Sequence, residues 1–306
     1  MATERTIVVL ASATIVSRTR MTNAFAATAD YWALTKPEVN FLIVIAAFVG
    51  FRMASSAALL LTVAHMLIAT LFVASGAAAL NQFFERSFDK QMRRTSRRPV
   101  AAGRIHPSNA LWFGICLSVL GMLCLAAINI LTAALGAATL VTYLFLYTPL
   151  KRKTPVCTLI GAFPGAAPPL IGWAAARGRL DPEAWVLYAI VFLWQFPHFM
   201  SIAWMYREDY ARAGYRVLPS PRFRNRFVAW QSYAPALALI PVALLPSLTK
   251  ESGIVYVVAA TLLSFAFLYT SVRFSFCRSN LTARQLLLAS IFYLPLLFAV
   301  LVLDKK

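Results

Sequence analysis

The stretch from residue 57 to residue 100 reads AALLLTVAHMLIATLFVASGAAALNQFFERSFDKQMRRTSRRPV. Residues 57–80 form a long apolar run, and Asn81, Glu85 and Asp89 then follow at intervals of four residues. On an α-helix each such interval turns about 40° past a full turn, so the three side chains fall within roughly 80° of arc. The spacing therefore predicts a one-sided row of oxygen ligands, about 6 Å apart along the helix axis, which we call the oxygen row.

Six cations lie within or just after the oxygen row, at Arg86, Lys90, Arg93, Arg94, Arg97 and Arg98. Carboxylate and amide oxygens suit Mg²⁺, which proteins often hold with one or two carboxylates and the phosphates of a substrate. Guanidinium groups suit the remaining phosphate oxygens. Charge alone favours a solvated loop between two membrane helices. The regular spacing and the position at a helix end favour instead a site for magnesium and phosphate.

The composition indicates a polytopic membrane protein. Of 306 residues 60% are hydrophobic and 13% are charged, and the mean hydropathy is +0.69, values outside the range of soluble domains. The net charge of +18 would also fit a nucleic-acid-binding protein. The cations lie in short loops between apolar runs, however, which is the pattern of cytoplasmic loops in membrane proteins. The four cysteines form no CxxC pair, so neither a zinc site nor a disulfide framework is indicated.

Nine apolar segments are long enough to cross a bilayer. We expect them at residues 38–56, 58–84, 108–128, 130–149, 155–176, 183–206, 227–248, 252–272 and 284–303. With the N-terminus inside, 23 of the 29 Lys and Arg residues fall on the inner side and 6 on the outer side. This bias predicts an all-α bundle of nine transmembrane helices with the N-terminus inside and the C-terminus outside.

The N-terminal region is expected to be a mobile tail over residues 1–29, followed by a single transmembrane domain over residues 30–306. Residues 6–16 are too short an apolar run to span a bilayer, and a secretory signal is not favoured. Met21 is an alternative start. Lys36 is expected at headgroup level, and Pro37 suits the first turn of a helix.

The sixth segment ends in a second group of polar residues. Trp194, His198 and Asp209 lie there, and eleven residues separate His198 from Asp209. Eleven residues at 100° each come within about 20° of three full turns, so both side chains share one face if the helix continues. A histidine inside an apolar segment is typical of a functional site. The alternative is a structural histidine that hydrogen-bonds to a neighbouring helix.

Together these residues resemble the UbiA superfamily of intramembrane prenyltransferases, over most of the chain. The most specific similarity lies in three motifs, Asn81-x₃-Glu85-Arg86-x₂-Asp89-x₂-Met92-x-Arg94-Thr95-x₂-Arg98-Pro99, Tyr147-Thr148-Pro149-Leu150-Lys151-Arg152-x-Thr154 and Trp194-Gln195-x-Pro197-His198-Phe199. Quinone-type members usually carry a second Asp-rich box, which is absent here because Ala213 stands four residues after Asp209. The histidine motif is similar to that of members whose acceptor is heme.

The resemblance implies nine helices around a central cavity that opens to the inner face. It also implies that a farnesyl group passes from farnesyl diphosphate to a vinyl group of heme B, with addition of water, to give heme O and diphosphate. Mg²⁺ would bridge the diphosphate to Asn81, Glu85 and Asp89. The resemblance further implies that the diphosphate is neutralised by Arg94, Arg98 and Lys151, and that the heme side is formed by His198, Trp194 and Asp209.

Two other functions compete with this one. The first is a prenyltransferase whose acceptor is an aromatic quinone precursor, and the second is a membrane transporter. Transporters more often carry polar residues at mid-membrane depth, whereas this chain concentrates them at one membrane face. We expect a bacterial inner membrane, rather than a mitochondrial one, with the active site toward the cytoplasm. Heme A synthase or a terminal oxidase is the expected protein partner.

Overall fold

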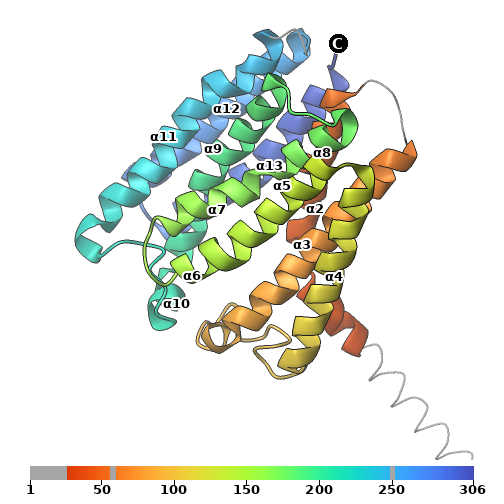
Figure 1. Cartoon of the computed structure of the whole chain (residues 1–306). Helices are drawn as coiled ribbons and strands as arrows, with labels where there is room; N and C mark the ends of the chain where they lie inside the picture. The colour runs from red at the N-terminus through yellow and green to blue at the C-terminus, as the bar shows by residue number, and fades with distance from the viewer. Residues whose placement is uncertain (1–25, 56–59, 249–251) are drawn as a thin grey trace, which may run out of the picture.

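A computed structural model of the chain describes residues 26–55, 60–248 and 252–306. The expectations for a tail and for an alternative start fall largely on residues 1–25, outside the described residues. Helix covers residues 26–34. The helices that follow are α2 (Pro37–Ala54), α3 (Leu60–Asp89), α4 (Pro107–Ile128), α5 (Ile130–Val141), η1 (Thr142–Tyr147), α6 (Thr148–Leu150), α7 (Cys157–Ala166), α8 (Pro168–Arg177), α9 (Pro182–Met205), α10 (Arg207–Arg212), α11 (Pro221–Leu248), α12 (Ile254–Phe276) and α13 (Asn280–Leu303) (Figure 1).

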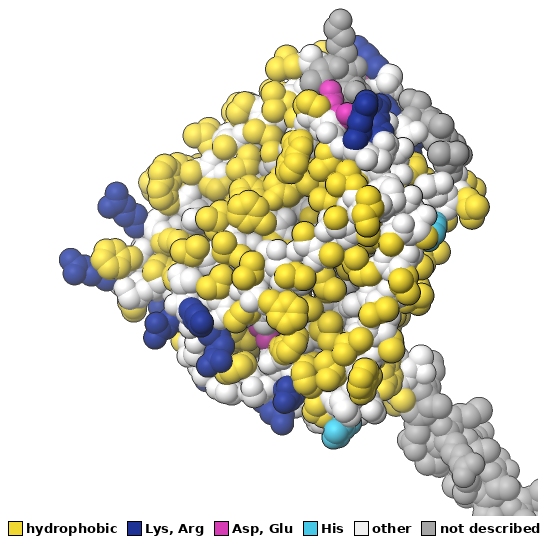
Figure 2. Space-filling model, viewed as in Figure 1, with side chains coloured by type: hydrophobic (Ala, Val, Ile, Leu, Met, Phe, Trp, Pro, Cys, Tyr) yellow, Lys and Arg dark blue, Asp and Glu magenta, His cyan; other side chains and the backbone are white. Residues whose placement is uncertain are grey.

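Within the described residues, nine helical spans are long and apolar enough to cross a membrane, which confirms the predicted number. Figure 2 shows the matching surface, because hydrophobic side chains cover the middle of the face drawn and Lys and Arg gather toward its ends. The protein is therefore a multi-pass membrane protein. Which end faces the cytoplasm stays a prediction, supported by the distribution of Lys and Arg.

Two of the nine spans are interrupted helices. The fourth passes from α5 through the wide π-helical turn η1 into α6. The fifth is divided between α7 and α8 at Ala167, between Pro164 and Pro168. Proline lacks a backbone N–H and crowds the preceding turn, so it interrupts a helix at this point. The sequence predicted each span as continuous, and both breaks lie inside the predicted ranges.

The ends of two helices differ from their predicted limits in a way that affects the site. The second apolar segment was expected to end at residue 84, but α3 continues to Asp89 and so carries the whole oxygen row. The seventh was expected to start at residue 227, but α11 begins at Pro221 and extends beyond the apolar run. Apolar composition marks the part of a helix inside the bilayer, not the turns that project from it.

The middle of the bundle is packed closely where α2 crosses α8. A side chain on Gly172 would meet the carbonyl of Ala47, and one on Gly50 would meet the backbone of Pro169. The absence of a Cβ at both glycines therefore allows the two backbones to touch, as small residues do at helix contacts in membranes. A large core of buried apolar residues continues from this crossing through α9, α11, α12 and α13.

The polar end of the molecule is formed by segments that are distant in sequence. The end of α3, the short helix α6 and helix α10 all lie toward the lower end of the molecule in Figure 1. The segment that precedes α2 is fixed against α3, because Gln82 donates a hydrogen bond of 3.1 Å to the carbonyl of Leu34. These segments bring the candidate residues together.

Candidate active site

The oxygen row lies on the last turns of α3, inside the protein. The relative exposures of Asn81, Glu85 and Asp89 are 2%, 6% and 1%. An ionised carboxylate that is buried to this extent requires a partner of opposite charge or a metal ion. The helical placement predicted from the spacing is therefore confirmed, and the interpretation as a solvated loop is wrong for these three side chains.

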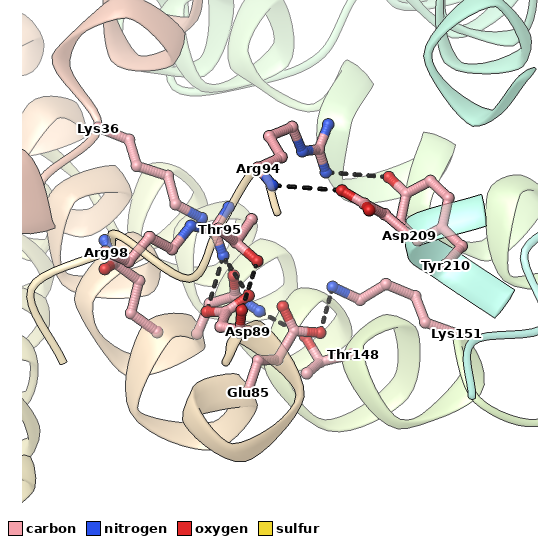
Figure 3. Close-up of polar contacts among 12 residues, drawn as sticks. Lys36, Glu85, Asp89, Arg94, Thr95, Arg98, Thr148, Lys151, Asp209 and Tyr210 are labelled. Carbon is pink, nitrogen blue, oxygen red and sulfur yellow. Dashed lines mark hydrogen bonds and ion pairs between the residues drawn. The ribbon is translucent and has the colours of Figure 1, made fainter. Parts of the chain in front are cut away.

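Each member of the oxygen row is matched by one cation from a different part of the chain (Figure 3). Lys36 donates a hydrogen bond of 3.0 Å to Asn81 Oδ1. Lys151 Nζ lies 2.5 Å from Glu85 Oε1. Arg98 NH1 donates to both carboxylate oxygens of Asp89 at 2.9 Å. The result is a compact group of three oxygen side chains and three cations at the end of α3.

Lys36 is a member of this group that the sequence did not predict. It caps α2 in the left-handed backbone conformation, with φ 51° and ψ 62°, and among the described residues it is the one non-glycine residue with positive φ. Strain of this kind is often found at functional sites. Burial, followed by the nearby charge of Arg98, lowers the pKa of Lys36 from 10.5 to about 7. Additional negative charge beside this amine would therefore favour its protonated, positively charged form.

Lys151 has the opposite electrostatic balance. Burial alone would lower the pKa of Lys151, but the adjacent Glu85 carboxylate raises it above its ordinary value. The ammonium group therefore stays charged, and it lies 4.8 Å from the ring centroid of Tyr147, close enough for a cation–π interaction. Lys151 is thus a fixed positive charge in a largely dehydrated position.

The loop between α3 and α4 folds over the oxygen row. Thr95 Oγ1 donates a hydrogen bond of 3.0 Å to the backbone carbonyl of Asp89. Arg94 binds α10 through its backbone N–H, 3.2 Å from Asp209 Oδ2, and through its guanidinium group, 3.1 Å from the Tyr210 hydroxyl. The loop is therefore attached both to α3 and to α10, and Arg98 and Arg94 project from it (Figure 3).

The interactions of Asp209 differ from those expected from the sequence. His198 and Asp209 would share a face only if one helix continued through both, but α9 ends at Met205 and α10 begins at Arg207. After the break at Tyr206, the Asp209 carboxylate contacts the backbone N–H of Arg94. The sequence held a signal of this break in Glu208 and Asp209, which lie in the first turn of α10. Acidic residues are typical of the first turn of a helix.

A pocket of about 280 Å³ opens beside Glu85. Its lining is formed by Phe84, Glu85, Phe88, Leu144, Phe145, Thr148, Pro149, Arg152 and Tyr215. The pocket therefore has mainly apolar walls, with one carboxylate and one guanidinium group among them. Burial and the Glu85 carboxylate raise the pKa of Tyr215 well above its ordinary value, so its hydroxyl stays protonated. The pocket can therefore hold an apolar chain next to a polar head.

His198 belongs to a separate cluster inside the bundle. Its imidazole stacks on the indole of Trp194, with ring centroids 4.8 Å apart and an interplanar angle of 24°. His198 Nδ1 lies 2.8 Å from Ser290 Oγ of α13, and the Trp194 indole N–H donates to the Ser290 carbonyl at 2.8 Å. These two contacts fix the histidine motif of α9 to α13. The cluster is therefore separate from Lys36, Lys151 and Arg98, which contact α3.

The donor set at the end of α3 fits a magnesium ion that is completed by a substrate. In the described ranges no group of three or more His, Cys, Asp or Glu side chains could hold a metal alone. The oxygen row offers two carboxylates and one amide oxygen, all buried and turned to one side of α3. Magnesium commonly takes one or two carboxylates and fills its remaining positions with water and substrate phosphates.

Three residues of the site were not among the predicted site residues, namely Lys36, Thr148 and Tyr215, although Thr148 belongs to one of the three motifs. Thr148 Oγ1 accepts a hydrogen bond of 3.4 Å from the amide of Asn81, and Tyr215 lines the pocket beside Glu85. No local spacing connects these residues to α3. The left-handed cap before Pro37 also has no sequence signal, because the residue in that position is a lysine rather than a glycine.

A nine-span bundle with buried carboxylates and fixed cations at one end is suited to a lipid substrate with a polyanionic head. A sequence model described as the UbiA prenyltransferase family matches residues 42–301. The chain therefore belongs to the UbiA prenyltransferase family. Family membership confirms the resemblance seen in the three motifs, and the interpretation as a transporter is wrong.

Similar proteins of known name cover nearly all of the chain. The protoheme IX farnesyltransferase of Solibacter usitatus is 47% identical over 287 residues, which are 90% of this chain and 98% of the relative. That of Koribacter versatilis is 45% identical over 288 residues, 90% of this chain and 93% of the relative. Both relatives thus match the chain over almost their full lengths.

Solved structures confirm the fold. One reported for digeranylgeranylglyceryl phosphate synthase superposes with a TM-score of 0.74 at 16% identity, over 90% of this chain and 98% of the other. A UbiA homologue from Archaeoglobus fulgidus bound to GPP and Mg²⁺ gives a TM-score of 0.61 at 18% identity, over 89% and 99% of the two chains. The predicted all-helical prenyltransferase fold is therefore confirmed.

Proposed function

We propose that the protein transfers the farnesyl group of farnesyl diphosphate to a vinyl group of heme B, with addition of water, to form heme O and diphosphate. The observation that carries the proposal is the oxygen row, in which each of three buried side chains is matched by a cation. The names of the relatives in Solibacter usitatus and Koribacter versatilis support heme as the acceptor.

Binding of the donor would begin with an exchange of partners at the end of α3. In the absence of substrate Glu85 and Asp89 pair with Lys151 and Arg98, and Asn81 accepts a hydrogen bond from Lys36. We propose that Asn81, Glu85 and Asp89 hold Mg²⁺ when the diphosphate arrives, and that Lys36, Lys151 and Arg98 turn to phosphate oxygens. When bound, Mg²⁺ would act as a Lewis acid that withdraws charge from the diphosphate.

The first chemical step breaks the allylic C–O bond, and the electron pair leaves with the diphosphate. Lys151 and Arg98 stabilise this leaving group, because positive charges already directed at the diphosphate offset the negative charge that develops on it. Arg94 lies on the same loop and adds a third cation. The apolar pocket walls keep water from the farnesyl cation until the acceptor reacts.

In the second step the terminal vinyl carbon of heme attacks the farnesyl cation and forms the new C–C bond. Positive charge then lies on the vinyl carbon next to the porphyrin ring. A water molecule adds there and releases a proton, which leaves a hydroxyl group on that carbon. We place His198 and Trp194 on the heme side of this reaction, since they form the stacked pair of the histidine motif.

Asp209 is assigned a supporting role on the diphosphate side. Its carboxylate accepts the backbone N–H of Arg94 and pairs with Arg212 at 3.0 Å, so both oxygens are engaged. A carboxylate in this state orients the loop that carries Arg94 and Arg98. This proposal replaces the heme-side role expected from the sequence.

The proposal includes a cellular setting. The excess of Lys and Arg on the polar end supports an active site that faces the cytoplasm of a bacterial inner membrane, and the named relatives are bacterial. Because a farnesylated heme partitions into lipid, we propose that a membrane protein such as heme A synthase or a terminal oxidase receives the product.

The experiment that tests the acceptor supplies labelled farnesyl diphosphate and Mg²⁺ to membranes that contain the protein. Heme B and 4-hydroxybenzoate are offered in parallel reactions, and the products are separated by chromatography. The proposal expects the label to migrate with a heme more hydrophobic than heme B. Transfer of the label to the aromatic acid, with heme unchanged, would contradict it.

A further inference from the structure

Ser290 of α13 receives hydrogen bonds from two side chains of α9. The indole N–H of Trp194 donates to its backbone carbonyl at 2.8 Å, and His198 Nδ1 lies 2.8 Å from its hydroxyl oxygen. The exposure of Ser290 is 0%. A single buried serine residue is therefore the hydrogen-bond partner of both Trp194 and His198.

The position of one proton follows from the neighbouring contact. Ser290 Oγ lies 2.6 Å from the carbonyl oxygen of Leu287. A carbonyl oxygen can only accept, so the single hydroxyl proton of Ser290 is used in this bond. Ser290 Oγ must then accept from His198, which places the imidazole proton on Nδ1. In the neutral ring Nε2 is therefore an unprotonated nitrogen with a free lone pair.

The ring is also fixed in orientation. It stacks on Trp194, and the ring of Phe199 approaches it at 5.6 Å with an interplanar angle of 62°. Among the described residues Nε2 makes no hydrogen bond, while the side chain as a whole is half-buried. The lone pair of Nε2 is thus available to a ligand that approaches from outside the cluster.

We propose that His198 Nε2 is the axial ligand of the iron in the heme acceptor, and that Ser290 is the positioning residue that holds the required tautomer. The proposal rests on the proposed function, because it assumes a heme substrate. Histidines that bind metals usually donate their second ring N–H to a fixed acceptor, which sets the tautomer and the ring direction. Imidazole is a common axial ligand of heme iron.

This arrangement gives the acceptor site a requirement for iron. Ligation from one side fixes the porphyrin against α9 and α13, while the diphosphate is held by α3 and its cations. A porphyrin without a central metal would lose the axial bond but keep its apolar contacts. The protein would therefore distinguish heme from metal-free porphyrin, although both carry the vinyl group that reacts.

The test uses the full-length protein in detergent, titrated with heme B and with metal-free protoporphyrin IX while the visible absorption spectrum is recorded. We expect wild type to give the spectrum of histidine-ligated heme. For His198→Ala and Ser290→Ala we expect heme affinity to fall about 10- to 100-fold, as for loss of a ligand or of its fixed partner. Binding of the metal-free porphyrin should not change, which also shows that the variants are folded.

Three further variants separate positioning from packing. Ser290→Thr keeps the hydroxyl group and should keep the heme spectrum. Ser232→Ala is the matched control, because Ser232 is also fully buried and donates to its own helix, 2.6 Å from the Val228 carbonyl, without a histidine partner. Ser232→Ala should behave as wild type. Imidazole added to His198→Gly should restore the spectrum.

The outcomes distinguish this inference from the proposed function. Equal loss of affinity for heme and for metal-free porphyrin in His198→Ala would overturn the inference, and so would an unchanged spectrum in Ser290→Ala. If either result comes with normal heme O formation by wild type, the proposed function stands and the assignment of His198 as the axial ligand is wrong. If wild type binds no heme and forms no heme O, both are wrong.

Discussion

Lys151 Nζ lies 2.5 Å from Glu85 Oε1, and the two side chains are only 12% and 7% exposed. The pair joins the end of α3 to the residue that follows α6. Removal of one partner from a buried ion pair typically costs about 3–5 kcal/mol, because the other charge is left uncompensated. A buried ion pair contributes little net stability, because the cost of removing both charges from water offsets their attraction. It becomes useful if each charge acquires a new partner when substrate binds.

Glu85→Gln should abolish turnover while the protein remains folded in the membrane. Glutamine keeps the size of the side chain but loses the charge that would bind Mg²⁺ and balance Lys151. We expect kcat to fall at least about 100-fold, as when a preorganised electrostatic group is removed from an active site. The measurement is the rate of product formation at saturating farnesyl diphosphate and Mg²⁺.

Glu208→Gln is the matched control for that experiment. Its side chain is 81% exposed, and its nearest cation is Arg207 at 3.7 Å. This variant should retain wild-type activity. Full activity in Glu85→Gln would remove the argument for a metal site on the oxygen row.

Lys36→Met should raise the KM for farnesyl diphosphate about tenfold or more. The change keeps the apolar stem and removes the amine that contacts Asn81, and an interaction with one diphosphate charge is comparable to a charge-assisted hydrogen bond of about 1.5–3 kcal/mol. Steady-state kinetics with varied farnesyl diphosphate provide the measurement. Lys153→Met, at an exposed lysine of the loop between α6 and α7, should leave the KM unchanged; a similar rise in both variants would indicate only a general loss of positive charge.

Asp209→Asn should weaken the use of farnesyl diphosphate and leave heme binding unchanged. Asn cannot form the ion pair with Arg212, and it weakens the hydrogen bond from the backbone of Arg94. A rise in KM of a few-fold is expected, because removal of one partially exposed pair costs about 1 kcal/mol. The heme dissociation constant is the second measurement. If heme binding weakens instead, Asp209 belongs to the acceptor side, as the sequence indicated.

The sequence predicted the number of helices and the oxygen row because both follow from local rules. Apolar length predicts spans, and the spacing of Asn81, Glu85 and Asp89 predicts one face of a helix. The pairing of this row with Lys36 and Lys151 could not be predicted, since those residues are brought to α3 by tertiary packing. A rule that depends on helix continuity also failed at Tyr206, where the chain turns without a proline or glycine.

Gly172→Ala should destabilise the protein. A methyl group at this position would meet the backbone of Ala47 where α2 crosses α8, and neither backbone can move without opening the core. Overpacking of this kind costs about 1–3 kcal/mol. The measurement is the midpoint of thermal unfolding in detergent, which we expect to fall by several degrees.

Gly136→Ala is the comparison for packing. The first contact of its methyl group would be Leu125 Cδ1, at the flexible end of a side chain, so the midpoint should change much less. An equal rise of the midpoint in the two variants would show that helix propensity, which favours alanine over glycine, determines the outcome rather than the contact between α2 and α8.

The most direct test of the central claim is the mass of the product that the purified protein forms from heme B, farnesyl diphosphate and Mg²⁺. We predict a heme that has gained one farnesyl group and one hydroxyl group, and whose hydroxyl oxygen carries the label when the reaction is run in H₂¹⁸O. Chelation of Mg²⁺ should stop its formation. Recovery of unmodified heme B under these conditions, while the same protein transfers the farnesyl group to 4-hydroxybenzoate in a parallel reaction, would contradict the account.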